Sequence, residues 1–177
     1  LTEDEKRFYT WTLQSHIDLA RAVWLDYCEC KMIDTIAREP LWRHLINYRC
    51  GTGHSVSFVG NVHEGPHALN SRNTTRMRPG MVVTDEPGVY ETDLVGIRIE
   101  NELVCIHKAD NQYGTFLGFE PLTFVPIATS PILPGVLDKD ELAWLNDYHR
   151  QVFAKLAPHL NAEERVWLAE KCASIGC

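Results

Sequence analysis

Apolar residues near the start of the chain recur every three or four positions. This periodicity, with a capping-box pattern at Thr2 and Glu5, predicts a helix over residues 3–27. A second, shorter helix is predicted around residues 32–37. Pro40 either ends this helix or opens a further turn after it, because proline lacks the backbone N–H of a helix interior.

The helical spacing returns near the C-terminus. Asp138 or Asp140 can cap a helix that continues to Leu156, and a last helix is predicted after Asn161. Prolines interrupt the segment before these helices and prevent regular structure there. The segment follows Pro121, and the interrupting prolines are Pro126, Pro131 and Pro134.

Between residues 47 and 128 the helical spacing fades and short β-rich runs appear between Gly and Pro residues. The predicted strands are residues 81–86, 96–101, 103–107 and 115–119. Residues 88–95 and 109–114 are predicted to be hairpin connections. Helices, a mostly antiparallel sheet and further helices together predict an α+β fold, with residues 1–177 forming a single domain.

Composition narrows the function classes. The 177 residues carry a formal net charge of −7 without a basic stripe, so a nucleic-acid partner is not expected. No apolar run approaches the roughly 18 residues of a membrane span, so no membrane partner is expected either. We expect a cytoplasmic protein. Because the chain begins with Leu1 rather than Met, it is also expected to be a processed product or a piece of a longer polypeptide.

The six cysteines lack the paired spacing of a structural zinc site. They are Cys28, Cys30, Cys50, Cys105, Cys172 and Cys177. Free thiols are the expected state, although the sequence Cys28-Glu29-Cys30 leaves a redox or metal role open.

Candidate chemistry centres on residues 51–66, which combine two histidines, an acid and several Gly and Pro residues. This composition favours a shaped loop. The run from His63 to His67 matches the zinc-protease pattern HExxH, but that pattern requires a helix, and Gly-Pro at its centre disfavours one. We therefore reject a helical zinc site and expect His67 to be an ordinary loop residue.

His54, Glu86 and Glu100 are better candidates for a metal centre. One imidazole with two carboxylates suits Mn²⁺, and also Zn²⁺ or Co²⁺. Each residue has a plainer alternative: Glu86 could be an exposed strand end, Glu100 could pair with Arg98, and His54 could be a core histidine.

Five ordered blocks strongly resemble the catalytic domain of Xaa-Pro aminopeptidases (aminopeptidase P). They are Gly51-Thr52-Gly53-His54, Asn61-Val62-His63-Glu64-Gly65-Pro66, Thr84-Asp85-Glu86-Pro87-Gly88, Gly96-Ile97-Arg98-Ile99-Glu100-Asn101 and Phe119-Glu120-Pro121-Leu122-Thr123. Asp34-Thr35-Ile36-Ala37-Arg38 and Trp144-Leu145-Asn146 also look like family segments. The resemblance therefore runs over nearly the whole chain.

The resemblance implies an incomplete pita-bread fold with N-terminal helices, a curved antiparallel sheet and C-terminal helices. It implies two divalent metal ions bridged by a water, held by two aspartates, a histidine and two glutamates. His54, Glu86 and Glu100 match the last three ligands. His63 matches a histidine that assists substrate binding and proton transfer, and Arg98 matches an arginine of the site.

The chain also departs from the family pattern. No acidic pair that could serve as the two aspartate ligands follows Leu1, so these ligands are expected upstream and the fragment is expected to bind metal partly or not at all. Cys50 replaces a histidine that the family usually carries, which puts proton shuttling in doubt. Ser55 and Ser57 replace glycines and could narrow the pocket near the metals.

The expected function is that of an Xaa-Pro aminopeptidase fragment, whose parent removes an N-terminal residue that precedes proline and forms a homodimer. The isolated fragment is expected to be inactive. A catalytically dead pita-bread module that binds peptides or proteins is the alternative from another class. Within the fold, a prolidase or a creatinase-like hydrolase is a further alternative.

Overall fold

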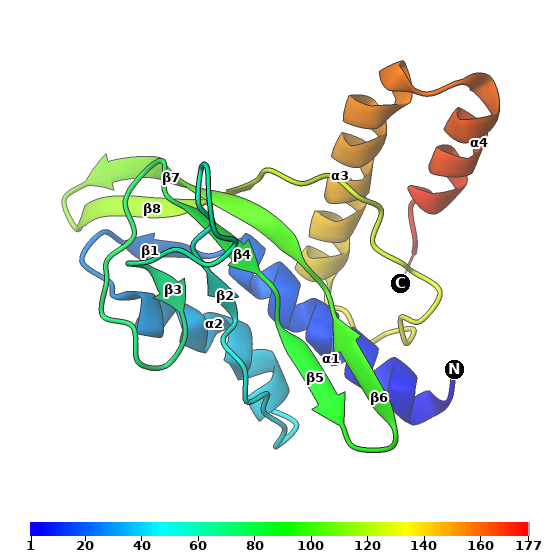
Figure 1. Cartoon of the computed structure of the whole chain (residues 1–177). Coiled ribbons are helices and arrows are strands. Elements are labelled where there is room, and N and C mark those ends of the chain that lie inside the picture. The colour runs from blue at the N-terminus through cyan, green and yellow to red at the C-terminus, as the bar shows by residue number, and fades with distance from the viewer. Residues whose placement is uncertain (177) are drawn as a thin grey trace. The chain divides into compact units, whose positions relative to one another are not determined.

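The computed structural model describes residues 1–176, and Figure 1 labels the elements. Its contacts divide the chain into two compact units. One unit consists of residues 1–10 and 124–177, and the other of residues 11–123. Cys177, whose free thiol was predicted, lies outside the described residues.

The larger unit, residues 11–123, contains a four-stranded antiparallel sheet in the order β1-β8-β7-β4. Its strands are β1 (Val23–Leu25), β4 (Val82–Asp85), β7 (Asn101–Asn111) and β8 (Gly114–Pro121). The two long strands β7 and β8 form a hairpin, visible in light green in Figure 1. Buried Leu103, Cys105, Leu117 and Phe119 alternate along them, as expected for a sheet with one face in the core.

Helix α1 (Glu3–Ala20) begins with the predicted capping box, in which Thr2 and Glu5 exchange side-chain and backbone hydrogen bonds. The prediction that it continues to residue 27 is wrong. Residues 23–25 form β1 instead, because Val23 to Leu25 pair with Phe116 to Gly118 along the edge of the sheet. This tertiary pairing outweighs an apolar pattern that also fits a helix.

Helix α2 (Cys30–Trp42) is longer than predicted and continues through Pro40 for a short distance. Its apolar face is buried through Ile33, Ala37 and Leu41. The Ser15 hydroxyl donates to the Ala37 carbonyl, which joins α2 to α1.

Two small ribbons complete the unit. Strands β2 (Gly53–His54) and β3 (Ala68–Leu69) pair with each other, and β5 (Gly88–Glu91) pairs with β6 (Val95–Arg98). The prediction that residues 88–95 merely connect two strands is therefore wrong, because half of that segment is itself a strand. The predicted strand over residues 96–101 is also divided, since β6 ends at Arg98 and β7 begins at Asn101.

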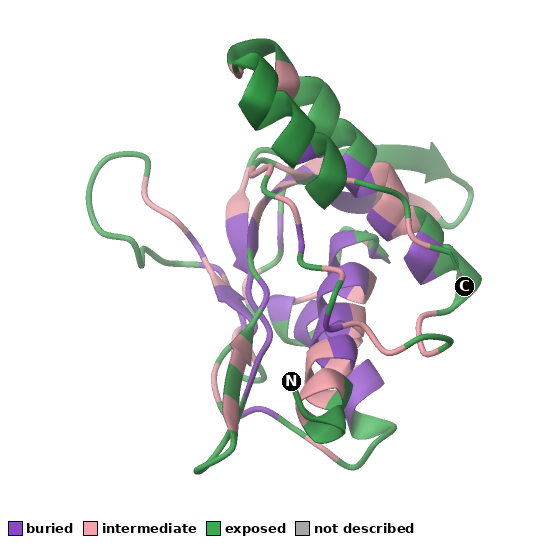
Figure 2. Cartoon of the chain, turned by 90° about the vertical axis from the view of Figure 1, so that its right-hand side faces the viewer, coloured by how far each residue is buried: buried purple, intermediate pink, exposed green. Residues whose placement is uncertain are grey.

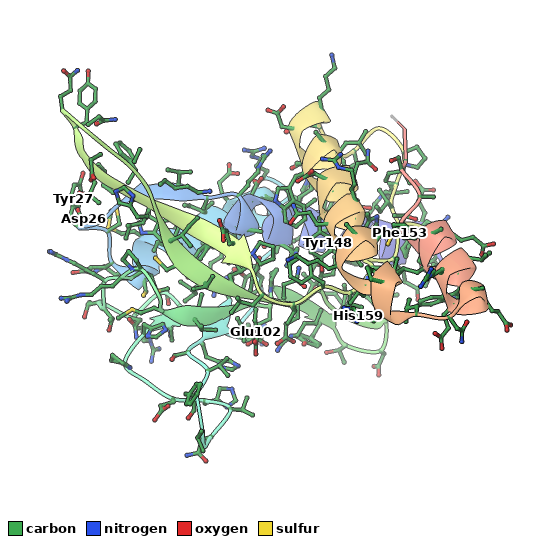
Figure 3. All side chains as sticks on the ribbon, turned by 90° about the horizontal axis from the view of Figure 1, so that it is seen from above. Asp26, Tyr27, Glu102, Tyr148, Phe153 and His159 are labelled. Carbon is green, nitrogen blue, oxygen red and sulfur yellow. The ribbon has the colours of Figure 1, made fainter. Side chains whose placement is uncertain are left out.

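The smaller unit contains α3 (Lys139–Leu156), the 3₁₀ helix η1 (Ala157–His159) and α4 (Ala162–Lys171). Both helices begin where predicted, with Asp138 rather than Asp140 as the cap of α3 and Asn161 as the cap of α4. Each cap is part of a complete capping box. Tyr148 and Phe153 extend from α3 (Figure 3), and the Tyr148 hydroxyl is bonded to the backbone of Val125. Figure 2 shows α4 as an almost wholly exposed helix, and its one buried residue is Leu168.

The predicted α+β class is confirmed, because helices come before and after the antiparallel sheet along the sequence. The proline-rich segment between β8 and α3 contains neither helix nor strand, as predicted. In the part of the chain that the structure covers, no helix combines the length and the apolar character that crossing a membrane requires.

Candidate metal centre

Glu86 and Glu100 lie at matching breaks in two neighbouring strands. β4 pairs with β7, with Asp85 opposite Asn101, and β5 pairs with β6, with Gly88 opposite Arg98. Residues 86–87 and 99–100 are the unpaired links between these two ladders. The sheet register therefore brings two carboxylates that are fourteen residues apart to the same place.

His54 reaches this place from β2, which packs against β4. The His54 backbone N–H donates to the Thr84 hydroxyl, with 2.9 Å between nitrogen and oxygen. The approach requires a glycine before it, because a Cβ on Gly53 would lie 1.8 Å from the Thr84 carbonyl oxygen. The Glu86 N–H also donates to the Thr52 carbonyl at 2.8 Å, which fixes this segment to the acid.

Glu86 is the best-connected acid of the site, and its residue is only 7% exposed. Its Oε1 lies 3.1 Å from His54 Nε2 and accepts a 2.7 Å hydrogen bond from the Thr84 hydroxyl. Its Oε2 accepts a close, charge-assisted hydrogen bond from Arg98. Glu86 is thus not the exposed strand end that one alternative proposed.

Glu100 is exposed and makes no hydrogen bond or ion pair within residues 1–176. It does not pair with Arg98, whose guanidinium is bound to Glu86 instead. Desolvation and then the negative charge of Glu86 raise the pKa of the Glu100 carboxyl, while Arg98 and His54 act in the opposite direction. Glu100 therefore lies within electrostatic reach of the other three side chains.

The pair of His54 and Glu86 fits a shared divalent ion. Two ligand atoms that are each about 2.1 Å from one ion at a right angle are separated by about 3 Å, and the observed separation is 3.1 Å. The His54 side chain is 19% exposed, so it is not a core histidine. Within residues 1–176, however, no three acidic, His or Cys side chains converge as ligands of one ion. The residue types therefore suit a divalent metal ion, but Arg98 is bonded to one carboxylate oxygen of Glu86.

His63 stands beside His54, with ring centroids 3.9 Å apart and the planes tilted by 48°. Both rings line a cavity of about 270 Å³ together with Glu86 and Arg98. His63 belongs to the exposed segment 56–66, which follows β2 and returns to β3. A cavity of this size with two imidazoles, a carboxylate and a guanidinium can bind a small polar group and move protons to or from it.

Cys50 lies at the edge of this cavity. Its thiol sulfur is 3.6 Å from Arg98 Nη2 and 3.8 Å from the Gly88 carbonyl oxygen. The Arg98 guanidinium also lies over the ring of Tyr90, 5.6 Å from its centroid. Tyr90 was missed at the sequence level, where residues 88–95 were assigned to a connection. Its strand position, two residues after Gly88, is the signal that places it near Arg98.

A buried polar network beneath the site was also missed. Arg38 donates to the Asp34 carboxylate at 2.8 Å and to the carbonyls of Tyr48 and Cys50 at 2.8 and 2.9 Å. The Thr52 hydroxyl donates to the other oxygen of Asp34. The spacing of Asp34 and Arg38 on one face of α2 was the available signal.

His67 and residues 61–66 show why the HExxH pattern does not apply. The segment is not helical. His67 lies in a loop, as expected, and it is buried there with its Nε2 2.8 Å from the Val82 carbonyl oxygen. The five described cysteines, Cys28, Cys30, Cys50, Cys105 and Cys172, are free thiols, as predicted.

One His on β2 and two Glu in the links between strand ladders define a candidate metal site, and comparison with known families gives the class of protein. Residues 1–107 match metallopeptidase family M24, and residues 115–175 match the C-terminal region of the same peptidases. The chain belongs to metallopeptidase family M24.

Its relatives include Xaa-Pro aminopeptidases. The chain is 39% identical over 182 residues to a probable Xaa-Pro aminopeptidase P of Laccaria bicolor, covering 98% of this chain and 28% of that protein. It is 43% identical over 171 residues to aminopeptidase P2 of Arabidopsis thaliana, covering 93% and 24%. The chain thus spans about a quarter of the length of these relatives.

Among solved structures, the X-prolyl aminopeptidase of Caenorhabditis elegans matches with a TM-score of 0.92 and 37% identity, over 99% of this chain and 29% of that one. That protein is described as a cytosolic enzyme with a di-nuclear active site. The prolidase of Pyrococcus furiosus matches with a TM-score of 0.59 and 26% identity over 70% of this chain. The resemblance and the pita-bread fold inferred from the sequence blocks are both confirmed.

Proposed function

We propose that this chain is the part of an Xaa-Pro aminopeptidase that carries His54, Glu86 and Glu100 as metal ligands, and that the parent hydrolyses the bond between an N-terminal residue and proline. The single observation that supports this most strongly is the meeting of His54, Glu86 and Arg98 with His63 around one cavity. The parent's substrate class follows from the relatives at about 40% identity.

Two divalent ions, Mn²⁺ in the first place with Zn²⁺ or Co²⁺ as alternatives, would supply Lewis acidity and a hydroxide at neutral pH. The chain's own residues would do the rest. His54 Nδ1 lies 3.1 Å from the Ser55 carbonyl. If Nδ1 donates there, the lone pair of Nε2 is left to bind metal.

Arg98 orients Glu86 by its ion pair, in a site that is partly closed to water. His63, which is exposed and lies beside His54, can accept or donate a proton at the leaving amine. We also propose that the parent is a cytoplasmic homodimer, in line with the cytosolic C. elegans relative for the compartment.

We expect the isolated chain to hydrolyse little, because three ligands alone hold two ions poorly. The test compares an Xaa-Pro peptide with its Xaa-Ala counterpart in the presence of Mn²⁺, by mass spectrometry for cleavage and by calorimetry for binding. The Xaa-Pro peptide should bind several-fold more tightly. Equal binding of the two peptides would contradict the proposed substrate class.

The cleavage readout separates the two parts of the proposal. Robust Xaa-Pro cleavage that disappears in Glu100→Ala would show that the isolated chain is active after all. Cleavage that survives Glu100→Ala would contradict the ligand assignment. Glu120→Gln removes an exposed carboxylate from β8 and provides the matched control for a change of charge.

One observation favours a second candidate, a binding module without catalysis. Arg98 occupies one oxygen of Glu86, and its other terminal nitrogen contacts Cys50 where the family usually has a histidine. Such a module would bind the Xaa-Pro peptide equally well with and without Mn²⁺. A requirement for the metal in peptide binding therefore decides between the two candidates.

A further inference from the structure

A second and larger cavity adjoins the candidate metal centre. It has a volume of about 700 Å³ and shares Cys50, Gly51 and Asn70 with the cavity of His54 and Glu86. We call it the arginine groove, because Arg38, Arg49 and Arg72 line it. Its remaining lining residues are Trp42, Asn47, Tyr48 and Ser71, so its lining contains no acidic residue.

The three arginines of the groove differ in whether their guanidinium groups have bonded partners. Arg38 is buried and its guanidinium is committed to Asp34 and to backbone carbonyls. Arg49 and Arg72 are exposed, and within residues 1–176 neither guanidinium has an ion-pair or hydrogen-bond partner. Two positive charges thus face a cavity without a counter-charge, in a chain whose formal net charge is −7.

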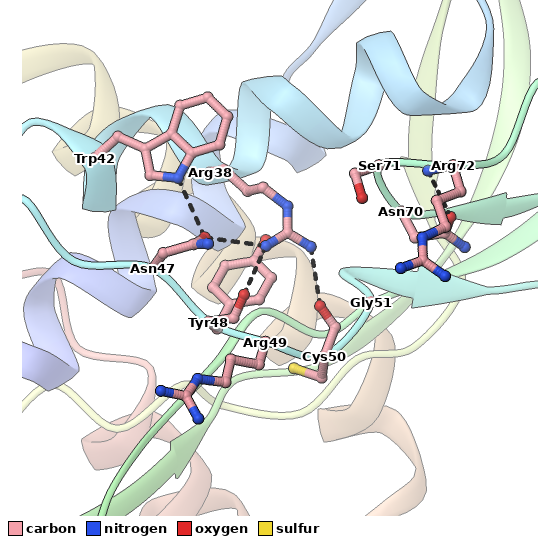
Figure 4. A pocket seen from close by; sticks show the side chains of 10 residues that line it. All are labelled: Arg38, Trp42, Asn47, Tyr48, Arg49, Cys50, Gly51, Asn70, Ser71 and Arg72. Atoms are coloured by element: carbon pink, nitrogen blue, oxygen red, sulfur yellow. Dashed lines mark hydrogen bonds between the residues drawn. The ribbon is translucent and has the colours of Figure 1, made fainter.

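The backbone that carries both arginines is fixed. Arg38 donates to the carbonyls of Tyr48 and Cys50, which flank Arg49 on either side. Asn70 Oδ1 accepts a 3.0 Å hydrogen bond from the Arg72 N–H, which fixes the start of the turn on the other side. Figure 4 shows Arg49 and Arg72 at opposite sides of the cavity, with Cys50 and Gly51 between them.

We propose that the arginine groove binds a carboxylate of the substrate peptide on the C-terminal side of the scissile bond. This inference rests on the proposed function. An aminopeptidase holds the N-terminal residue of the peptide at the metals, so only the part of the bound peptide after the scissile bond can extend out of the site. Cys50 and Gly51 line both cavities, so a bound peptide can continue from the metal centre into the arginine groove. The carboxylate is the C-terminus of a short peptide or the side chain of a downstream Asp or Glu.

Binding is measured by calorimetry on the whole chain with peptides of sequence Ala-Pro-(Ala)n, each as free acid and as C-terminal amide. Solvent-exposed ion pairs contribute roughly 0.2–1 kcal/mol each, so the two arginines together should favour the best-fitting acid by about tenfold over its amide. Arg49→Ala or Arg72→Ala should reduce this preference to about threefold, and the double variant should abolish it.

Arg78→Ala is the matched control, because Arg78 is equally exposed and lies outside the groove. Peptide amides with Glu or Gln after the proline distinguish a side-chain carboxylate from the C-terminus as the bound group. Equal binding of acid and amide, a preference that survives the double variant, or no binding of either peptide would overturn the proposal.

The proposed function is tested separately by replacing proline with alanine in the same peptides. Loss of the preference for proline with retention of the acid preference would contradict the proposed function and support the groove. Retention of the proline preference without an acid preference would overturn the groove alone.

Discussion

The segment from Tyr48 to His54 has two sides that differ in burial and in the number of bonded partners of their charged groups. On one side, Arg38, Asp34 and Thr52 form a buried network in which each charge has several partners. On the other side, Cys50 and His54 line an open cavity. Glu100 is exposed and has no bonded partner within residues 1–176. The difference indicates that the buried network supports the segment and leaves the open side free for chemistry.

The largest effect should come from breaking the buried network. Arg38→Met leaves the Asp34 carboxylate buried without its counter-charge, and we expect the free energy of unfolding to fall by about 3–5 kcal/mol. Urea denaturation measures the loss. Arg43→Met at the C-cap of the same helix removes an exposed pair with Glu39 and should change the free energy of unfolding by less than about 1 kcal/mol. Similar losses in both variants would contradict the contrast between the two sides.

A smaller loss is expected where β2 meets β4. Gly53→Ala places a methyl group against the Thr84 carbonyl and must push the strands apart, at a cost of about 1–3 kcal/mol. Gly51→Ala is the matched control, since its nearest neighbour, the Leu69 carbonyl, would be 3.4 Å away. Denaturation midpoints that are equal for the two variants would show that the approach of β2 to β4 is not constrained.

His149 on α3 is another buried polar group with a bonded partner, like the residues of the buried network. Its Nε2 lies 3.1 Å from the Ile127 N–H and accepts from it, and burial lowers the pKa of His149 below its usual 6.5. The unfolded chain therefore takes up the proton first as the pH falls. Stability that is present above pH 6.5 is lost as the pH falls through the folded-state pKa. Urea denaturation between pH 7.5 and 5.5 should show this loss, with a weaker slope in His149→Gln.

The smallest effect is expected on the exposed side, in segment 56–66. Phe58 is fully exposed, so Phe58→Ser should change the free energy of unfolding by no more than about 0.5 kcal/mol. Leu69→Ala, at the buried strand where the segment ends, should cost about 2–5 kcal/mol. A large loss in Phe58→Ser, measured by urea denaturation, would mean that the tip is covered in solution.

Much of this arrangement could be predicted from the sequence. The capping residues Thr2, Asp138 and Asn161 each announced a helix, because a cap is a local signal. The end of α1 could not be predicted in this way, because Val23 to Leu25 form a strand only by pairing with residues that are about 90 positions away.

The candidate site shows the same division. His54, Glu86 and Glu100 were selected from ordered sequence blocks, but the placement of Glu86 beside Glu100 depends on the register between β4 and β7. The ion pair of Arg98 with Glu86, rather than with nearby Glu100, could not be read from spacing. The role of Arg38 beneath Cys50 was hidden as well, since it joins α2 to a loop through backbone carbonyls that carry no sequence signal.

Metal binding tests the central claim most directly. Electron paramagnetic resonance follows free Mn²⁺ as protein is added to the ion. The account predicts weak but measurable binding by the chain, reduced at least about tenfold in His54→Gln, Glu86→Gln and Glu100→Gln, since each removes one expected ligand. Glu120→Gln should bind as the unmodified chain does. Binding that is unchanged in all three ligand variants would contradict the assignment of this site to a metal.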